Sequence, residues 1–166
     1  MSNEAILDVA GLTVALPPGL DRPNAIEDIS FSVGAGEIVC VVGESGSGKS
    51  VTAQAVMGLL PKALTPSAGE TRLQGEDTLA AHTNRLRDLR GTKMAMIFQE
   101  PMTALSPVAR VGEQISEMLE IHTDMTAAQR RARAIEIMDH VHLPDPEKMV
   151  DSFPHQLSGG RRQRIM

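Results

Sequence analysis

The segment GESGSGKS, residues 43–50, has the residue types and spacing with the clearest chemistry. Its glycines let the backbone turn tightly and bring several N–H groups close to one anion. The helix that we expect to begin here adds its partial positive charge at the same point. Lys49 can then reach the β and γ phosphates of a nucleotide, and Ser50 can bind Mg²⁺. The pattern predicts a nucleotide phosphate site made of Gly43, Glu44, Ser45, Gly46, Ser47, Gly48, Lys49, Ser50 and Val51.

The residues on either side of this segment agree with a phosphate loop. Residues 37–42, EIVCVV, form a nearly uninterrupted apolar run, typical of a strand that is covered on both faces in a parallel sheet. Residues 49–60 suit a helix that stops at Pro61. A strand, a glycine-rich loop and a helix in this order favour nucleotide binding over a purely structural turn. A small metabolite kinase would also fit the loop, so a second motif has to decide.

That second motif is LSGG, residues 157–160, which is followed by RRQR. Ser158 offers a hydroxyl, and Gly159 and Gly160 expose backbone N–H groups at an expected helix N-terminus. Such a turn favours a phosphate group. A small metabolite kinase would not need a second turn of this kind.

A third motif is IFQEP, residues 97–101. Its glutamine, Gln99, ends another apolar run, residues 93–99, which we interpret as a buried strand. The amide of Gln99 would therefore lie at the carboxyl edge of the sheet, where open α/β sheets bind their ligands.

The remaining elements indicate how these motifs are positioned. Residues 5–16 and 26–33 predict two strands separated by a proline-rich loop, and residues 69–75 predict a short edge strand. Residues 78–91 predict a helix that Gly91 closes. Residues 108–154 are mostly helical by pattern, with Thr126 and Gln129 as a capping box. The order of strands and helices predicts an α/β fold.

Composition limits the classes of function. With 42% hydrophobic and 22% charged residues, the chain has the balance of a globular protein, and its net charge of −5 argues against general affinity for nucleic acid. Cys40 is the lone cysteine, so a disulfide framework is excluded, and we expect this residue in the core. No apolar run approaches the roughly 20 residues that cross a bilayer, and no secretory pattern opens the sequence. We expect a cytoplasmic protein.

The three motifs, in this order and near this spacing, resemble the phosphate loop, Q-loop and signature of the ABC transporter ATPases. The resemblance implies a phosphate-loop NTPase fold of the ABC ATPase type. It has an N-terminal antiparallel β portion, a helical subdomain and, here, an incomplete core sheet. Residues 1–107 would hold the β portion and the first part of the core, with the Q-loop at 99–107. Residues 108–157 would be the helical subdomain, and residues 157–166 the signature and the start of its helix.

The resemblance also implies roles for residues and a second ATPase domain, identical or related. Two such domains pack head to tail, and each ATP lies between the phosphate loop of one and the signature of the other. The signature residues here are Leu157, Ser158, Gly159, Gly160 and Gln163. Lys49 and Gln99 would be catalytic, with Gln99 contacting the attacking water and, together with Ser50, Mg²⁺. Leu16 falls where many members stack adenine on an aromatic ring, so we expect weak adenine affinity or selectivity.

Within the family, the sequences of the three motifs are most similar to those of ATPase subunits of importers for dipeptides, oligopeptides, glutathione or nickel. Such a subunit would lie peripherally at the cytoplasmic face of the inner membrane. It would contact permease subunits through the Q-loop region and a solute-binding protein indirectly, and we expect no nucleic acid partner. A non-transport ABC ATPase that acts on nucleic acid or ribosomes is the alternative.

The catalytic Asp and Glu of the Walker B strand and the switch His of the family cannot be assigned before Met166. We therefore expect this chain to be a fragment that binds ATP and turns over little of it. If the chain naturally ends at Met166, the alternative is a non-enzymatic nucleotide-binding or dimerisation module.

Overall fold

The computed structural model of this protein describes residues 5–98 and 104–166. The chain forms two compact units, Met1–Met94 and Ala95–Met166. Each unit has a hydrophobic core of its own. The functional division that the sequence predicts, after residue 107, stays a prediction.

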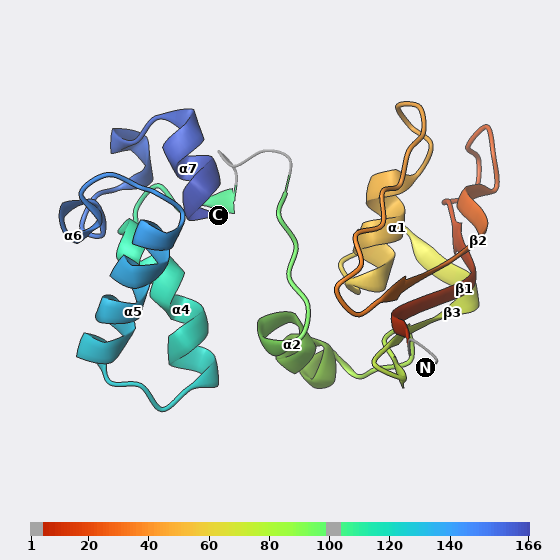
Figure 1. Ribbon diagram of the computed structural model, residues 1–166. Coiled ribbons are helices and arrows are strands. Elements are labelled where there is room, and N and C mark those ends of the chain that lie inside the picture. Colours follow the sequence, from red (N-terminus) through yellow and green to blue (C-terminus); the bar gives the residue numbers. More distant parts are fainter. Residues whose placement is uncertain (1–4, 99–103) are drawn as a thin grey trace. The chain divides into compact units, whose positions relative to one another are not determined.

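The first unit is built on an antiparallel sheet with the strand order β2-β1-β3-β4. Figure 1 labels β1, β2 and β3 of this sheet. Its strands are β1 (Ala5–Ala15), β2 (Asn24–Gly34), β3 (Thr65–Leu73) and β4 (Glu76–Asp77). The two predicted N-terminal strands are confirmed. The strand predicted at 69–75 is present as the second half of β3, but its edge position is wrong, because β3 is longer and lies between β1 and β4. Gln74 and Gly75, both with positive φ, turn the chain back so that β4 pairs with the end of β3.

Two helices, α1 (Lys49–Val56) and α2 (Thr83–Thr92), complete the first unit. The helix predicted at 49–60 ends early, because Gly58 follows it with φ +63°, a left-handed conformation that stops a helix. The predicted helix at 78–91 begins later, at Thr83, and passes through Gly91. One face of α1 packs on the sheet (Figure 1), and the core consists of Val9, Leu12, Val14, Ala25, Ile26, Ala55 and Val56.

Two predicted buried strands are not formed in the described residues. Residues 37–42 have no strand structure, and Ile38 and Val42 are 90% and 92% exposed. Residues 93–98 likewise have none, and Ile97 is 73% exposed. A strand of a parallel sheet needs neighbouring strands to satisfy its N–H and C=O groups, and the described residues supply none for these two segments. The prediction of a core position for Cys40 is wrong for the same reason, since this residue is exposed.

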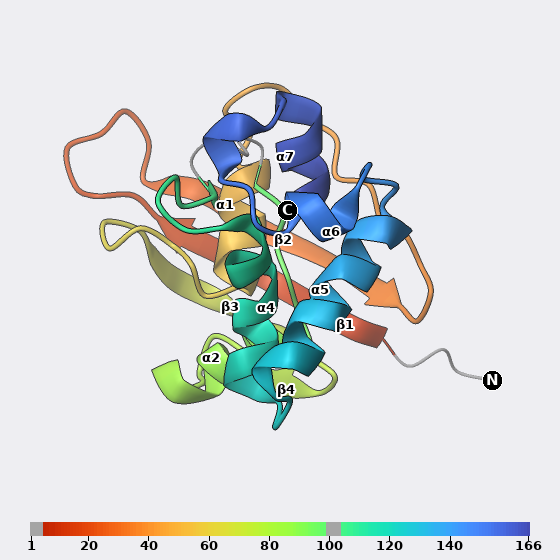
Figure 2. The same cartoon turned by 90° about the vertical axis from the view of Figure 1, so that its left-hand side faces the viewer.

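The second unit is helical. It contains α4 (Val111–His122), α5 (Ala127–His140), α6 (Pro146–Met149), the 3₁₀ helix η1 (Pro154–Gln156) and α7 (Gly159–Ile165). Helices α4 and α5 lie side by side (Figure 2). The core consists of Val111, Ala134, Met138, Leu143, Met149, Val150 and Leu157.

The predicted capping box of α5 is confirmed. The Thr126 hydroxyl accepts from the Gln129 N–H at 3.3 Å, and the Gln129 side chain accepts from the Thr126 N–H at 2.8 Å. The prediction that residues 108–154 are mostly helical is confirmed as well. Every helix in the described ranges is too short or too polar to span a lipid bilayer.

Candidate nucleotide-binding site

The phosphate loop meets α1 at a position that only glycine fits. Gly48 has φ +92°, and a Cβ atom there would overlap Cγ2 of Ile26 and lie 3.1 Å from the carbonyl oxygen of Ala25. Gly46, at φ +80°, also takes a left-handed conformation. The close fit of Gly48 against β2 therefore fixes the point where the loop becomes a helix.

Lys49 closes the loop from within. Its Nζ donates to the carbonyl oxygens of Gly43 at 2.7 Å and Glu44 at 2.6 Å, and to the Ser47 hydroxyl at 3.3 Å. The ammonium group thus lies at the centre of the predicted phosphate site. An ammonium has three donors on a flexible stem, so phosphate oxygens can replace these acceptors without a change in the fold.

The residues that follow Lys49 differ in exposure. Ser50 is exposed on the first turn of α1, so its hydroxyl is free to meet a ligand, while Val51 packs against the core of the first unit. Thr52, a buried residue, donates its hydroxyl to the Gly48 carbonyl at 3.1 Å. Ser45 and Ser47 belong to the loop itself.

The loop that contains Leu16 contacts the phosphate loop through another residue, Arg22. Leu16 packs against the core, and its N–H donates to the Pro23 carbonyl at 2.8 Å. From the same loop, Arg22 donates to the Gly46 carbonyl at 3.4 Å. Sequence reasoning missed Arg22, because one arginine in a proline-rich loop carries no signal of what it contacts.

The signature turn belongs to the second unit and is open. Ser158 precedes α7, and its carbonyl accepts from the Arg162 N–H at 3.0 Å, but its side chain makes no capping hydrogen bond. A Cβ atom at Gly159 or Gly160 would meet nothing within 4 Å. Leu157, 7% exposed, joins the helical core, while Gln163 is exposed. The turn is held at Leu157 and leaves its hydroxyl and first N–H groups unobstructed.

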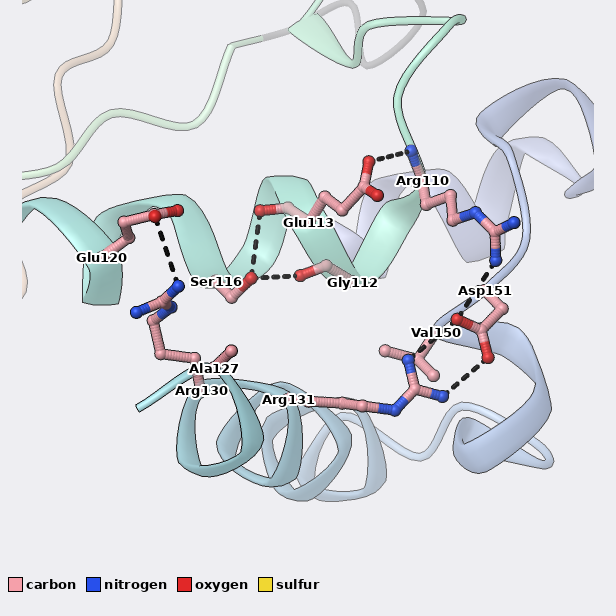
Figure 3. A pocket seen from close by; sticks show the side chains of 10 residues that line it. All are labelled: Arg110, Gly112, Glu113, Ser116, Glu120, Ala127, Arg130, Arg131, Val150 and Asp151. Atoms are coloured by element: carbon pink, nitrogen blue, oxygen red, sulfur yellow. Dashed lines mark hydrogen bonds and ion pairs between the residues drawn. The ribbon is translucent and has the colours of Figure 1, made fainter. Parts of the chain in front are cut away.

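The chain leading to the signature is held by Asp151. Both carboxylate oxygens accept from Arg131, at 2.8 and 2.6 Å, and Oδ1 also accepts from Arg110 at 3.4 Å (Figure 3). The hydrogen bonds from Arg131 lower the pKa of Asp151 below its ordinary value. Sequence reasoning missed this contact, since Asp151 and Arg131 are 20 residues apart.

Backbone hydrogen bonds also hold the segment before the signature, at residues 150–152. The N–H of Gly112 donates to the Val150 carbonyl at 2.8 Å, and the N–H of Val111 donates to the Ser152 carbonyl at 2.9 Å. These groups belong to the N-terminus of α4, where helical N–H groups lack partners within the helix. The ion pairs border a pocket of 490 Å³ whose wall includes residues of α4 and α5 and the segment 150–151.

Gln99, the third predicted contact of the nucleotide, lies outside the described residues, as do residues 100–103 of the Q-loop. Within the ranges 5–98 and 104–166, no group of three or more His, Cys, Asp or Glu residues is placed to hold a metal ion. The phosphate loop and the signature each have defined local geometry. The structure places them in different units.

The ABC transporter family model matches residues 26–166. The chain belongs to this family, and the predicted α/β fold of the phosphate-loop ABC ATPase type is confirmed.

The chain is similar to several curated relatives that are ATP-binding proteins of transport systems. The chain is 43% identical to the peptidoglycan transport ATP-binding protein YejF of Agrobacterium fabrum, over 99% of its own length and 30% of the relative. It is 42% identical to the probable D,D-dipeptide transport ATP-binding protein DdpD of Escherichia coli, over 99% of this chain and 50% of the relative. It is 42% identical to the oligopeptide transport ATP-binding protein OppD of Lactococcus lactis subsp. cremoris, over 100% of this chain and 49% of the relative. The chain spans half or less of the length of these relatives.

Solved structures agree on the fold. A dimeric post-hydrolysis state of the ATP-binding cassette MJ0796, bound to ADP and Pi, has a TM-score of 0.82 at 26% identity and covers 96% of this chain and 66% of that one. The structure of cbiO1 from Clostridium perfringens has a TM-score of 0.73 at 23% identity, over 97% and 59%, and supports the fold alone.

Proposed function

We propose that this chain is the nucleotide-binding part of an ABC importer subunit that couples ATP binding and hydrolysis to the uptake of peptides or similar small solutes. The observation that carries the proposal is the position of Lys49, whose ammonium group lies inside the glycine-rich loop at the start of α1. Family membership and the peptide-transport names of the relatives support the type of subunit.

In this proposal ATP binds with its phosphates in the loop formed by residues 43–51. The loop N–H groups and the N-terminus of α1 stabilise the phosphate charge, and Lys49 donates to the β and γ phosphates. Ser50 and Gln99 bind Mg²⁺, which neutralises phosphate charge when it is present. Gln99 also orients the attacking water. Leu16 contacts adenine through apolar surface only, so the base contributes little affinity.

The signature residues serve a second nucleotide. Ser158, Gly159 and Gly160 offer a hydroxyl and N–H groups to the γ-phosphate of an ATP held by a second ATPase domain, identical or related, packed head to tail. Leu157 anchors the turn in the core of the second unit. Gln163 lies on α7, the short helix that begins at Gly159. Hydrolysis is proposed for the complete subunit in such a pair.

The Q-loop region and the helical subdomain have roles of their own in this proposal. Residues 99–107 contact permease subunits at the cytoplasmic face of the membrane, and a solute-binding protein acts through those subunits. Residues 108–157 form the helical subdomain that connects this contact to the signature at 157–166.

The test is the affinity of the chain for ATP with Mg²⁺, measured by titration calorimetry. Lys49→Ala should weaken binding by about tenfold or more, because charge-assisted hydrogen bonds to phosphate are lost. Lys62→Ala is the matched control, because Lys62 is an exposed lysine a short distance beyond α1. Undetectable ATP binding by the unaltered chain, or equal affinity for the Lys49→Ala variant, would contradict the proposal.

A further inference from the structure

Arg90, on α2, bonds to the end of α1 that lies farthest from the phosphate loop. Its Nε donates to the Met57 carbonyl at 2.8 Å, and its Nη2 donates to the Gly58 carbonyl at 2.7 Å. Both carbonyls belong to the turn that follows α1, whereas the carbonyls of residues 53–55 in its last turn accept from backbone N–H groups. The negative end of the helix dipole favours a cation at this place. Arg90 therefore supplies a charge at the end of α1 and hydrogen-bond donors to the turn that follows it.

The fit around this contact is close. Gly58 has φ +63°, and a Cβ atom at this position would lie 2.9 Å from Nη2 of Arg90 and 2.9 Å from Cδ1 of Leu86. Leu89, the neighbour of Arg90 in the sequence, is 3% exposed. Shape and hydrogen bonds together fix the turn after α1 against α2.

The other end of α1 carries the chemistry of the phosphate loop. Gly48 packs against Ile26 of β2, and Lys49 begins the helix. A helix of eight residues is a rod of about 12 Å. The rod is held by Gly48 at one end, by core packing along one face and by Arg90 just beyond the other end, and these contacts together set the direction of its axis. That direction decides where the side chains of Lys49 and Ser50 point.

We propose that Arg90 is a positioning residue for the phosphate loop: through α1, it holds Lys49 in the orientation that binds nucleotide phosphate. The inference rests on the proposed nucleotide binding and adds a residue that contacts no nucleotide itself. The other arginines of α2 differ from Arg90 in their surroundings. Arg85 pairs with Glu76 at 2.7 Å and Arg87 is exposed.

The experiment compares ATP affinity and thermal stability for the unaltered chain, Arg90→Ala, Arg90→Lys and the control Arg87→Ala. Arg90→Ala should weaken ATP binding by about tenfold, which corresponds to the loss of one hydrogen bond between Lys49 and a phosphate oxygen. Arg90→Lys keeps the charge and should recover part of the affinity. Arg87→Ala should bind as the unaltered chain does. If Arg90→Ala does not fold, Arg90→Gln replaces it under the same criterion, because its amide can reach one carbonyl at most.

A double-mutant cycle separates positioning from a merely structural role. In a chain that already carries Lys49→Ala, Arg90→Ala should change ATP affinity by less than about twofold, because its effect passes through Lys49. Equal factors with and without Lys49 would overturn the inference, and so would wild-type affinity for a folded Arg90→Ala or Arg90→Gln variant. If the unaltered chain binds no ATP, the proposed function itself fails, which is a distinguishable result.

Discussion

The phosphate loop and the signature turn are both glycine-rich segments at the start of a helix, but the chain treats them differently. In the phosphate loop, Lys49 donates to the carbonyls of Gly43 and Glu44, and Gly48 packs against β2. At the signature, Gly159 and Gly160 face open space, and the Ser158 side chain makes no capping hydrogen bond. The phosphate loop is organised by the chain's own atoms. The signature turn offers donors that the described residues leave available to another molecule.

The two segments also differ in what holds them. The fit of the phosphate loop at Gly48 depends on backbone conformation and on the absence of a Cβ atom, neither of which responds to pH. The chain just before the signature turn depends on the charge of Asp151, which accepts from Arg131 and Arg110. A steric change should therefore affect the phosphate loop most, and an acidic solution should affect the signature turn.

The largest effect is expected from Gly48→Ala. The new Cβ would overlap Cγ2 of Ile26 and force a side chain into positive φ, which together should cost about 2 kcal/mol or more of unfolding free energy. Urea denaturation measures this cost. Gly159→Ala and Gly160→Ala are the controls, and they should leave stability unchanged or raise it by up to about 1 kcal/mol, because alanine is the better helix former. Equal losses at the three positions would remove the contrast between a closed loop and an open turn.

A smaller effect is expected from Asp151→Asn, and it should depend on pH. The pKa of Asp151 is lowered in the folded chain, chiefly by the hydrogen bonds from Arg131, so its stabilisation is present above the ordinary carboxyl pKa of about 3.9. It is lost as the pH falls through the lowered value. Asp151→Asn should thus be less stable than the unaltered chain at neutral pH, and the difference should shrink below about pH 4.

The measurement for Asp151 is urea denaturation followed across this pH range. Asp139→Asn, an exposed aspartate on α5, is the control. A stability difference that stays constant from neutral to acidic pH would mean that the charge of Asp151 does not hold the segment before the signature.

The smallest effect is expected from Ser158→Ala. Loss of a serine at a helix start usually costs about 1 kcal/mol, because its hydroxyl caps the helix. Here the hydroxyl makes no capping bond, so the thermal midpoint should stay close to that of the unaltered chain. A clear fall in the midpoint would show that Ser158 serves its own helix, and the turn would no longer count as open.

The sequence predicts the elements that depend on neighbours along the chain. The strands β1 and β2, the capping box of Thr126 and Gln129 and the turn of the phosphate loop each follow from residues within a short stretch. The apolar runs at 37–42 and 93–98 do not form the predicted strands, because such a run shows that a segment can be a strand but not whether a partner strand is present. Charge contacts across long separations also give no signal, since nothing in the sequence singles out Arg90 from the other arginines of α2.

The measurement that tests this account most directly is the ATP affinity of a Gly159→Asp chain, at a protein concentration too low for self-association. The added carboxylate lies at the start of α7, where it suits the helix dipole but repels a phosphate. If the phosphate loop binds nucleotide alone and the signature serves another chain's ATP, the affinity should stay within about twofold of the unaltered chain. A loss as large as that of Lys49→Ala would contradict the account, because the signature would then belong to the same chain's own site.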